Sequence, residues 1–393
     1  MGRMPAVEPR NRLVALDALR GVAAVIVLVH HISMTSPAVS AAYSSSIDVP
    51  IFSTGWWATL SPLKIFFAGP EFVLVFFVLS GFVLVLSPLQ QSVRGYNWLA
   101  YYPRRIVRLA IPVVVSVVLA AMWIALVPRT GVGGAWMAKQ GSPDLGLGNL
   151  LREASIVGYT GRPDVNPPLW SLAWEMWFSL LLPIGVILAV ATRRWTLAWA
   201  AALLTASTIG YLLAVEPLMY LPAFALGALL AANHASLRAI STRLAVRPGG
   251  VLLWTLVAVL GPLLLTAHWL LRPVLTAPWS ELTLALRVPG AVLVVATVAL
   301  WPAAQQLLSG RLLGWLGRIS FSLYLVHFPV VVTFGQVFGP EHWWWGAMVS
   351  VTVSLVLAQL MYRWVELPAQ ALAARVGAAF SAGQARAKAV TPA

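Results

Sequence analysis

Long apolar segments alternate with short polar connections along almost the whole chain of 393 residues. Each apolar segment is about 20 residues long, which is the length of a helix that crosses the hydrocarbon core of a membrane. Strands of a membrane β-barrel would need only about 10 residues. The pattern therefore predicts an all-α polytopic membrane protein, a bundle of about ten transmembrane helices. The expected spans lie at about residues 13–36, 65–87, 107–127, 168–190, 195–214, 218–234, 250–271, 288–305, 319–337 and 346–366.

The positions of the basic residues predict how these helices are oriented. Of the 26 Lys and Arg residues, 18 fall on one side of the expected membrane, seven fall on the other and Arg20 lies near the boundary. Since cytoplasmic connections carry the excess of Lys and Arg, both termini are expected in the cytoplasm. The same rule accounts for most of the formal net charge of +14, so we expect no nucleic-acid partner. Residues 1–368 then form one membrane domain, followed by a short cytoplasmic tail, 369–393, that we expect to be disordered.

Composition supports this class of protein and excludes several kinds of chemistry. The chain is 60% hydrophobic and only 10% charged, with a mean hydropathy of +0.84. Because it contains no cysteine, disulfides, thiolate metal sites and a cysteine nucleophile are excluded. It also contains no Walker loop, no HExxH and no GxSxG motif, so the sequence supports neither nucleotide hydrolysis nor the usual hydrolase sites, and no metal is expected.

The first apolar segment carries ionisable residues that a simple membrane anchor does not need. Arg20 and His31 are eleven positions apart, so on a helix they project within ~20° of each other and lie ~16 Å apart along the axis. Ionisable groups at such depth are costly and are usually functional. The alternative is that His31 only forms a hydrogen bond between helices. His30 points to another side of the helix, and we expect it to be structural.

Two further segments carry polar residues at comparable positions. In the fourth segment, Glu175 lies ~10 Å below the expected outer boundary, with Ser171 on the same face. In the ninth segment, Ser320, Tyr324 and His327 form one polar stripe on an otherwise apolar helix. A structural pair with an arginine or histidine is the alternative explanation for Glu175.

Three of these residues are expected at similar depths in the membrane. Measured from the inner boundary, His31 lies at ~16 Å, His327 at ~13 Å and Glu175 at ~20 Å. This agreement predicts a buried polar chamber that can hold a general base and its partners. The Gly-rich outer loop 128–167 is expected either to cover this chamber as a lid or to be an uncommitted flexible loop.

A third cluster lies at the expected cytoplasmic mouth. Arg104, Arg105 and Arg108 occur in the sequence YYPRRIVRLAIP, with Arg105 and Arg108 on one helical face. Guanidinium groups bind phosphate oxygens in a bidentate manner. Plain positive-inside charge explains the cluster equally well. With a buried histidine, the cluster describes an enzyme that draws a phosphate-bearing cytosolic carrier into the membrane.

At this point the motifs resemble those of a known family. They are LDALRGVAAVIVLVHH, which contains the basic-x10-His pattern, FFVLSGF at 76–82, RRIVRLAIP, WSLAWEMWFSLLLP, ISFSLYLVHFP and YRWVELP. In this order they resemble the acyltransferase-3 family, multi-span membrane O-acyltransferases that modify bacterial surface glycans, nodulation factors and macrolide antibiotics. The family usually has an acid two residues before the FF of FFVLSGF, where this chain has Leu74. Glu71 lies one turn earlier.

The resemblance implies a catalytic base with a basic companion, a pair of arginines that contact acyl-CoA, and a site lined by Glu175, Tyr324 and His327. Together with the polar stripes and the arginine cluster described above, it gives the following expectations. His31 is expected to be the catalytic base, with Arg20 as its companion and Glu175 in the same catalytic group. Arg105 and Arg108, with Arg104 beside them, are expected to contact acyl-CoA. Expected to bind the acceptor substrate are Tyr324, His327, Ser320 and Ser171.

The expected reaction moves an acyl group from acyl-CoA, with acetyl-CoA as the expected form, to a hydroxyl of a carbohydrate or of a glycosylated small molecule. The expected location is the bacterial cell membrane. The alternative is a proton-coupled exporter or a flippase of a glycan or lipid-linked substrate, which would also need His and Glu at mid-depth. The acceptor, the acyl length, direct transfer versus an acyl-enzyme, and the oligomeric state remain open.

Overall fold

The protein is a bundle of helices. A computed structural model describes residues 10–44, 49–91, 93, 95–157 and 162–390. Within these ranges every regular element is a helix and none is a strand, which confirms the predicted all-α class. Eight helices are long and apolar enough to cross a membrane, and the count reaches ten if each of two bent helix pairs is one span. The protein is therefore a multi-pass membrane protein.

The helices follow the order of the predicted segments. The long ones are α1 (Arg10–Ser33), α4 (Gly69–Gln91), α5 (Trp98–Leu126), α10 (Thr196–Leu213), α13 (Gly250–Leu271), α15 (Arg287–Leu300), α17 (Arg311–Phe338), α18 (Trp343–Met361) and α19 (Leu367–Val390). The bent pairs are α8 (Trp170–Leu180) with α9 (Leu182–Ala191), at 63°, and α11 (Glu216–Ala232) with α12 (His234–Ala245), at 69°. Short elements in the connections are α2 (Pro37–Ser44), α3 (Thr54–Thr59), η1 (Pro62–Phe67), α6 (Ala135–Ala138), α7 (Leu147–Ala154), η2 (Pro167–Leu169), η3 (Arg193–Trp195), α14 (Trp279–Leu282), η4 (Thr283–Leu286) and α16 (Pro302–Leu307).

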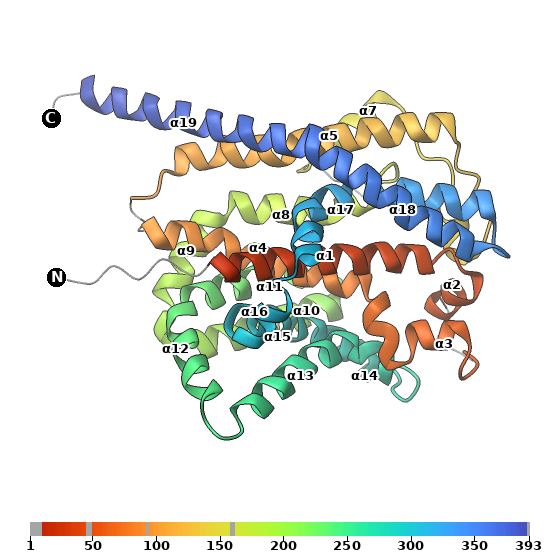
Figure 1. The fold of residues 1–393 in the computed structure, drawn as a ribbon, viewed down its shortest axis with the longest axis horizontal. Coiled ribbons are helices and arrows are strands. Elements are labelled where there is room, and N and C mark those ends of the chain that lie inside the picture. Colours follow the sequence, from red (N-terminus) through yellow and green to blue (C-terminus); the bar gives the residue numbers. More distant parts are fainter. Residues whose placement is uncertain (1–9, 45–48, 92, 94, 158–161, 391–393) are drawn as a thin grey trace.

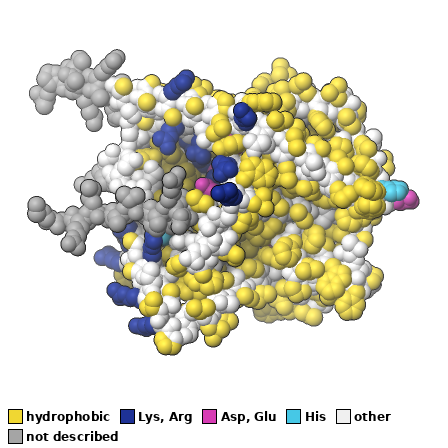
Figure 2. All heavy atoms as spheres, in the orientation of Figure 1, with side chains coloured by type: hydrophobic (Ala, Val, Ile, Leu, Met, Phe, Trp, Pro, Cys, Tyr) yellow, Lys and Arg dark blue, Asp and Glu magenta, His cyan; other side chains and the backbone are white. Residues whose placement is uncertain are grey.

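The long helices lie side by side, with α1 in the middle of the bundle (Figure 1). α1 packs against α17 and α4, and α4 packs in turn against α11. The described start of α1 and the end of α19 lie at the same end of the molecule, where Lys and Arg side chains also gather (Figure 2). We call this the inner end. The tail that we expected to be disordered after residue 368 is helical instead, because α19 continues from a π-helical turn (Tyr362–Glu366) and packs along α5.

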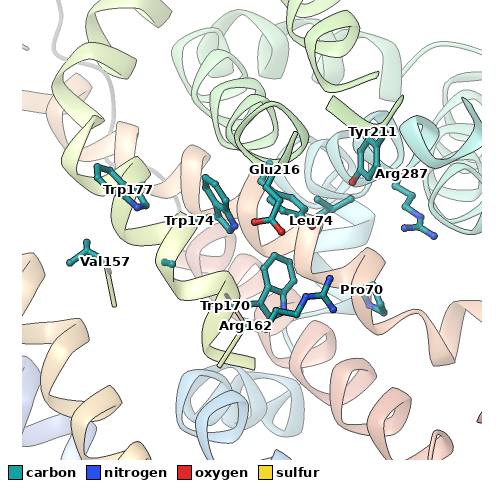
Figure 3. A pocket seen from close by; sticks show the side chains of 12 residues that line it. Pro70, Leu74, Val157, Arg162, Trp170, Trp174, Trp177, Tyr211, Glu216 and Arg287 are labelled. Carbon is teal, nitrogen blue, oxygen red and sulfur yellow. The ribbon is translucent and has the colours of Figure 1, made fainter. Parts of the chain in front are cut away.

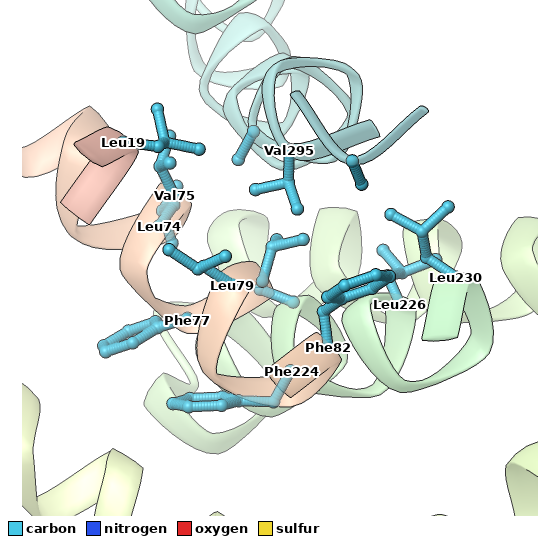
Figure 4. Close-up of a cluster of buried hydrophobic side chains, with 14 of the residues drawn as sticks. Leu19, Leu74, Val75, Phe77, Leu79, Phe82, Phe224, Leu226, Leu230 and Val295 are labelled. Carbon is cyan, nitrogen blue, oxygen red and sulfur yellow. The ribbon is translucent and has the colours of Figure 1, made fainter. Parts of the chain in front are cut away.

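The core lies where α1, α4, α11 and α15 meet. Phe82 of α4, Phe224 of α11 and Val295 of α15 are completely buried there (Figure 4). Removing such side chains would leave cavities that cost about 2–5 kcal/mol each. This packed wall fixes α4 against α1, and so fixes one side of the site described below.

α1 and α17 touch through two glycines. A Cβ atom on Gly21 would lie 2.5 Å from the Gly317 nitrogen, and one on Gly317 would lie 2.4 Å from the Asp17 carbonyl oxygen. Only glycine permits this approach. The two helices run in the same direction, and each carries a histidine ten residues after its glycine. Since both helices rise by the same amount per residue, the contact at Gly21 and Gly317 brings His31 next to His327.

Candidate active site

Two histidines from different helices meet at the centre of the site. The Nδ1 atom of His31 lies 3.0 Å from Nε2 of His327. Nδ1 of His327 lies 3.0 Å from the Leu323 carbonyl oxygen and 2.9 Å from that of Tyr324. His327 is completely buried, whereas His31 lies in the wall of a cavity. The predicted meeting of these two residues is therefore present in the structure.

These partners assign the protons of both rings. Since carbonyl oxygens only accept hydrogen bonds, Nδ1 of a neutral His327 must donate, which leaves its Nε2 as an acceptor. Nδ1 of His31 then donates to that acceptor. In a neutral His31 the remaining nitrogen, Nε2, carries a lone pair, and in the described part of the chain it has no hydrogen-bond partner. This is the protonation state that a general base needs.

The hydroxyls of Tyr324 and Ser171 connect α17 to the start of α8. They lie 2.7 Å from each other, and each lies 3.1 Å from the Pro168 carbonyl oxygen. Close by, the side-chain amide of Asn166 donates to the Leu325 carbonyl oxygen at 2.9 Å. These bonds hold the start of α8 at the level of the histidine pair.

A large cavity opens beside His31 toward the outer end. Its volume is about 840 Å³. Part of its wall comes from residues 138–143 and 162–164 of the long outer loop, which also places the Trp136 ring 6.1 Å from the ring of His31. The loop therefore covers the histidine, as the lid interpretation expects. We call this space the outer cavity.

Two buried residues of opposite charge, Glu153 and Arg129, hold this loop in place. The Glu153 carboxylate accepts hydrogen bonds from the backbone nitrogens of Asp164, Val165 and Asn166 at 2.7–3.0 Å. Arg129 donates to the carbonyl oxygens of Asp164 and Val165, both at 2.7 Å. Burial lowers the pKa of Arg129 to about 10, so the guanidinium stays charged at neutral pH. One short segment is thus held through both its N–H and its C=O groups.

A smaller cavity of about 80 Å³ lies toward the inner end. We call it the inner vestibule. It is lined by Arg20 of α1, Arg105 and Arg108 of α5, Glu175 of α8 and Glu366. Arg105 is engaged, because it lies 2.5 Å from the Glu175 carboxylate and donates to Ser179 at 3.1 Å. Arg20 and Arg108 have no ion pair or hydrogen bond to other described residues, so both guanidinium groups are available to a ligand.

A narrow space of about 30 Å³ lies between the vestibule and the outer cavity. It shares Arg20 and Glu175 with the vestibule, and Tyr324 and Val73 with the outer cavity. Ser171 and Ser320 also line it. A series of adjoining spaces therefore leads from the inner arginines to the histidine pair.

Two predicted site residues lie elsewhere than expected. Glu175 does not reach the histidines; it pairs with Arg105 in the inner vestibule. The reason is that α8 starts deep in the bundle, at the level of the histidines, and so carries Glu175 further inward than a helix starting at the outer boundary would. Arg104 does not line the vestibule; it is exposed and lies against Gly377 of α19.

The sequence interpretation missed a buried ion network near the outer end. Glu71, which is fully buried, lies 3.1 Å from Arg287 and 3.7 Å from Lys64, and accepts a hydrogen bond from Trp269 at 3.0 Å. Burial lowers the pKa of Lys64 to about 8, although the neighbouring Glu71 carboxylate opposes the shift. The sequence does show that the charged residues of this network stand in mostly apolar segments. Their spacing along the chain, however, does not show that their side chains contact one another.

This network adjoins a second outer cavity of about 450 Å³. Figure 3 shows its aromatic wall, with the Glu216 side chain near the Trp170 and Trp174 rings. The figure also shows Arg162 beside Trp170, and Arg287 beside Tyr211. We call this space the aromatic cavity.

Among the described residues, no three His, Asp or Glu side chains gather in a way that could hold a metal ion. The polar groups on the walls of the cavities include imidazole, guanidinium, carboxylate and hydroxyl groups. These groups can take up a proton, bind an anion and orient a hydroxyl.

Comparisons with known proteins agree with this arrangement. A family model described as an acyltransferase domain, that of the acyltransferase-3 family, matches residues 13–363. No curated protein and no solved structure gives a significant match. The matched range covers nearly the whole chain and contains His31, Arg108 and the complete wall of the outer cavity. The chain therefore belongs to the acyltransferase-3 family, and this membership supports an acyltransferase embedded in the membrane.

Proposed function

We propose that this protein transfers an acyl group, in the simplest case acetyl, from acyl-CoA to a hydroxyl of a carbohydrate or glycoside. The observation that carries the proposal is His31, whose Nδ1 is committed to His327 and whose Nε2 is left without a partner beside a large cavity. Family membership supports the class of reaction. The proposed location is the cell membrane of a bacterium, with both termini in the cytoplasm.

The donor binds from the inner side. Coenzyme A is strongly anionic, and the inner vestibule offers Arg20 and Arg108 as unpaired guanidinium groups, with Arg105 beside them. Guanidinium groups bind phosphate oxygens well, and a partly desolvated cavity strengthens such contacts. The thioester end then points through the narrow space toward Tyr324 and the histidines.

The acceptor occupies the outer cavity, where its hydroxyl meets His31. Nε2 of His31 takes the hydroxyl proton as the oxygen attacks the thioester carbonyl carbon. The carbon–sulfur bond then breaks, and the departing thiolate of coenzyme A receives that proton, which restores neutral His31. His327 orients the ring and stabilises its protonated form through the acceptor that it offers to Nδ1. The hydroxyls of Tyr324 and Ser171 are placed to orient the reacting groups.

The test follows radiolabelled acetyl groups in proteoliposomes that contain the purified protein. Labelled acetyl-CoA is supplied on the side of the inner vestibule, and a mixture of glycans is supplied on the other side. We expect label in the glycan fraction with the unaltered protein and none with the His31→Asn variant. Passage of an acceptor across the bilayer without acyl-CoA, and no labelled glycan, would instead identify a transporter.

A further inference from the structure

The aromatic cavity lies directly beside the outer cavity. The two spaces share three wall residues, Pro70, Arg162 and Trp170. A ligand whose hydroxyl reaches His31 in one space can therefore extend into the other. With about 450 Å³, the aromatic cavity is within the range of pockets that hold small organic ligands.

The walls of this cavity fit a ring. Trp170, Trp174 and Tyr220 contribute aromatic faces, and the Tyr220 ring lies 5.2 Å from Trp170 and 5.6 Å from Trp174. Flat apolar faces with polar groups at their edges are suited to sugar rings, which present C–H groups on their faces and hydroxyls around their rims.

The charges of the cavity favour a negative ligand. Arg162 and Arg287 oppose one carboxylate, Glu216. Arg287 shares its carboxylate partner, Glu71, with Lys64, so this single acid faces two cations. The Nε atom of Arg287 is buried and has no hydrogen-bond partner among the residues that the structure describes.

Excess positive charge in such surroundings is costly until a counter-charge arrives. The side chains of Lys64 and Glu71 are fully buried, and that of Arg287 is only 14% exposed. Among the described residues, the cluster of Lys64, Glu71 and Arg287 therefore holds one more positive than negative charge, and Arg287 brings this charge to the wall of the aromatic cavity.

We propose that the aromatic cavity binds an anionic sugar ring, one that carries a carboxylate or phosphate, next to the sugar whose hydroxyl is acylated. This inference rests on the proposed function and specifies its acceptor as an acidic glycan. The acid group lies between Arg162 and Arg287, and the ring lies against Trp170 and Trp174.

Binding is measured without acyl-CoA, so that the result does not depend on transfer. Purified protein in detergent micelles is titrated at pH 7 by calorimetry with glucuronate, glucose and glucosamine, which are anionic, neutral and cationic versions of one ring. We expect glucuronate to bind about tenfold more tightly than glucose, and glucosamine to bind most weakly. Equal affinity for the three sugars, or a preference for glucosamine, overturns the proposal.

Two variants test whether glucuronate binds in the aromatic cavity. Arg162→Gln changes an exposed residue, so folding is preserved, and should weaken glucuronate binding about tenfold with little effect on glucose. Glu216→Gln, also at an exposed position, removes the repelling carboxylate and should tighten glucuronate binding several-fold. Unchanged glucuronate affinity in Arg162→Gln places the binding elsewhere and overturns the proposal.

His31→Asn separates this inference from the function on which it rests. That variant should still bind glucuronate with the affinity of the unaltered protein, while transfer is lost. If transfer is lost but no charge preference exists, the acidic-sugar inference alone fails. If the charge preference exists but His31→Asn transfers acyl groups normally, the proposed catalytic role alone fails.

Discussion

The inner vestibule and the outer cavity differ in both size and chemistry. The vestibule is about 80 Å³, and its wall carries guanidinium and carboxylate groups from α1, α5, α8 and the π-helical turn. The outer cavity is about 840 Å³, and its wall combines loop backbone, aromatic rings and histidines. A narrow space of about 30 Å³ separates them.

The difference is what the proposed reaction requires, with an acyl carrier approaching from the inner side and an acceptor from the outer side. A phosphate-bearing carrier needs cations at a fixed position, and the vestibule places them on helices. A bulky acceptor needs room and a variable wall, and the outer cavity obtains these from a loop. Only the acyl end of the carrier has to reach the histidines, which is consistent with a narrow passage in between.

The largest expected effect is the loss of acyl transfer when His31 is replaced by asparagine. The same replacement at the neighbouring His30 serves as its control. His31→Asn keeps a donor to His327 near the place of Nδ1 but removes Nε2, so acyl transfer should fall about 10³-fold. His30→Asn is the matched control, because the Nδ1 atom of His30, which also lies in the wall of the outer cavity, bonds among the described residues to the Phe67 carbonyl oxygen and to Tyr43, and asparagine can replace that donor. Transfer rates in proteoliposomes measure both effects.

For His30→Asn we expect transfer within a few-fold of the unaltered protein. Equal losses in the two variants would show that His31, like its neighbour, serves packing and not proton transfer. The proposed assignment of proton transfer to His31, and not to the other histidine in the wall of the outer cavity, would then fail.

The next largest effect is a loss of stability, and it compares a buried acid near the outer end, Glu71, with an acid of the inner vestibule, Glu175. Glu71→Gln leaves Lys64 and Arg287 buried without a carboxylate, which should cost about 3–5 kcal/mol of stability. Glu175→Gln removes a carboxylate from one cation instead of two, and Arg105 keeps its hydrogen bond to Ser179, so this variant should cost less, about 1–3 kcal/mol. The midpoint of thermal unfolding in detergent measures both variants.

The pH dependence tests the cause of the Glu71 effect. The pKa of Lys64 is already lowered to about 8, and it should fall further without Glu71, because the carboxylate favours the charged amine. A lysine whose pKa is lowered by folding binds fewer protons when folded, so its stability contribution rises with pH. The gap between Glu71→Gln and the unaltered protein should therefore be larger at pH 6 than at pH 9. A gap that does not change with pH would show that Lys64 is not involved.

A smaller effect on kcat is expected when His327, which orients the ring of His31, is replaced. His327→Leu removes the acceptor for Nδ1 of His31, and kcat should fall about 10²-fold. His327→Gln can still accept through its side-chain oxygen and should retain several-fold more activity than the leucine variant. KM for both substrates should stay nearly constant in both variants. A change in KM with constant kcat would make His327 a residue of substrate binding alone.

The elements of the site that follow helix periodicity could be predicted from the sequence. Arg20 and His31 share a face of one helix, and Ser320, Tyr324 and His327 share a face of another, because the spacing along a helix fixes direction and height. The meeting of His31 and His327 required in addition that the two helices be parallel and in register, which the contact of Gly21 with Gly317 provides.

The elements that depend on loops could not be predicted. The depth of Glu175 was wrong because the estimate assumed that α8 starts at the outer boundary, whereas Asn166 and Pro168 bond to Leu325 and Tyr324 beside the histidines. The segment preceding α8 is held there by Arg129 and Glu153 from elsewhere in the same loop. Contacts between distant residues in irregular structure leave no periodic signal in the sequence.

The smallest expected effect, and the most specific for the inner region, concerns the arginines. Arg108→Ala removes an unpaired guanidinium from the vestibule, so KM for acetyl-CoA should rise about tenfold while kcat changes little. Arg104→Ala is the matched control, because Arg104 lies outside the vestibule, against α19, and its removal should change KM less than twofold.

Acetyl-pantetheine, which keeps the thioester but lacks the nucleotide and its phosphates, shows whether charge is the reason. If Arg108 binds a phosphate, the Arg108→Ala variant and the unaltered protein should have the same KM for this shortened donor. The difference in KM for acetyl-CoA should also shrink as salt is added, because a solvent-accessible charge contact is screened. A tenfold rise in KM for both donors would mean that Arg108 shapes the passage for the thioester arm. The division between a phosphate-binding inner region and an acceptor-binding outer region would then have to be withdrawn.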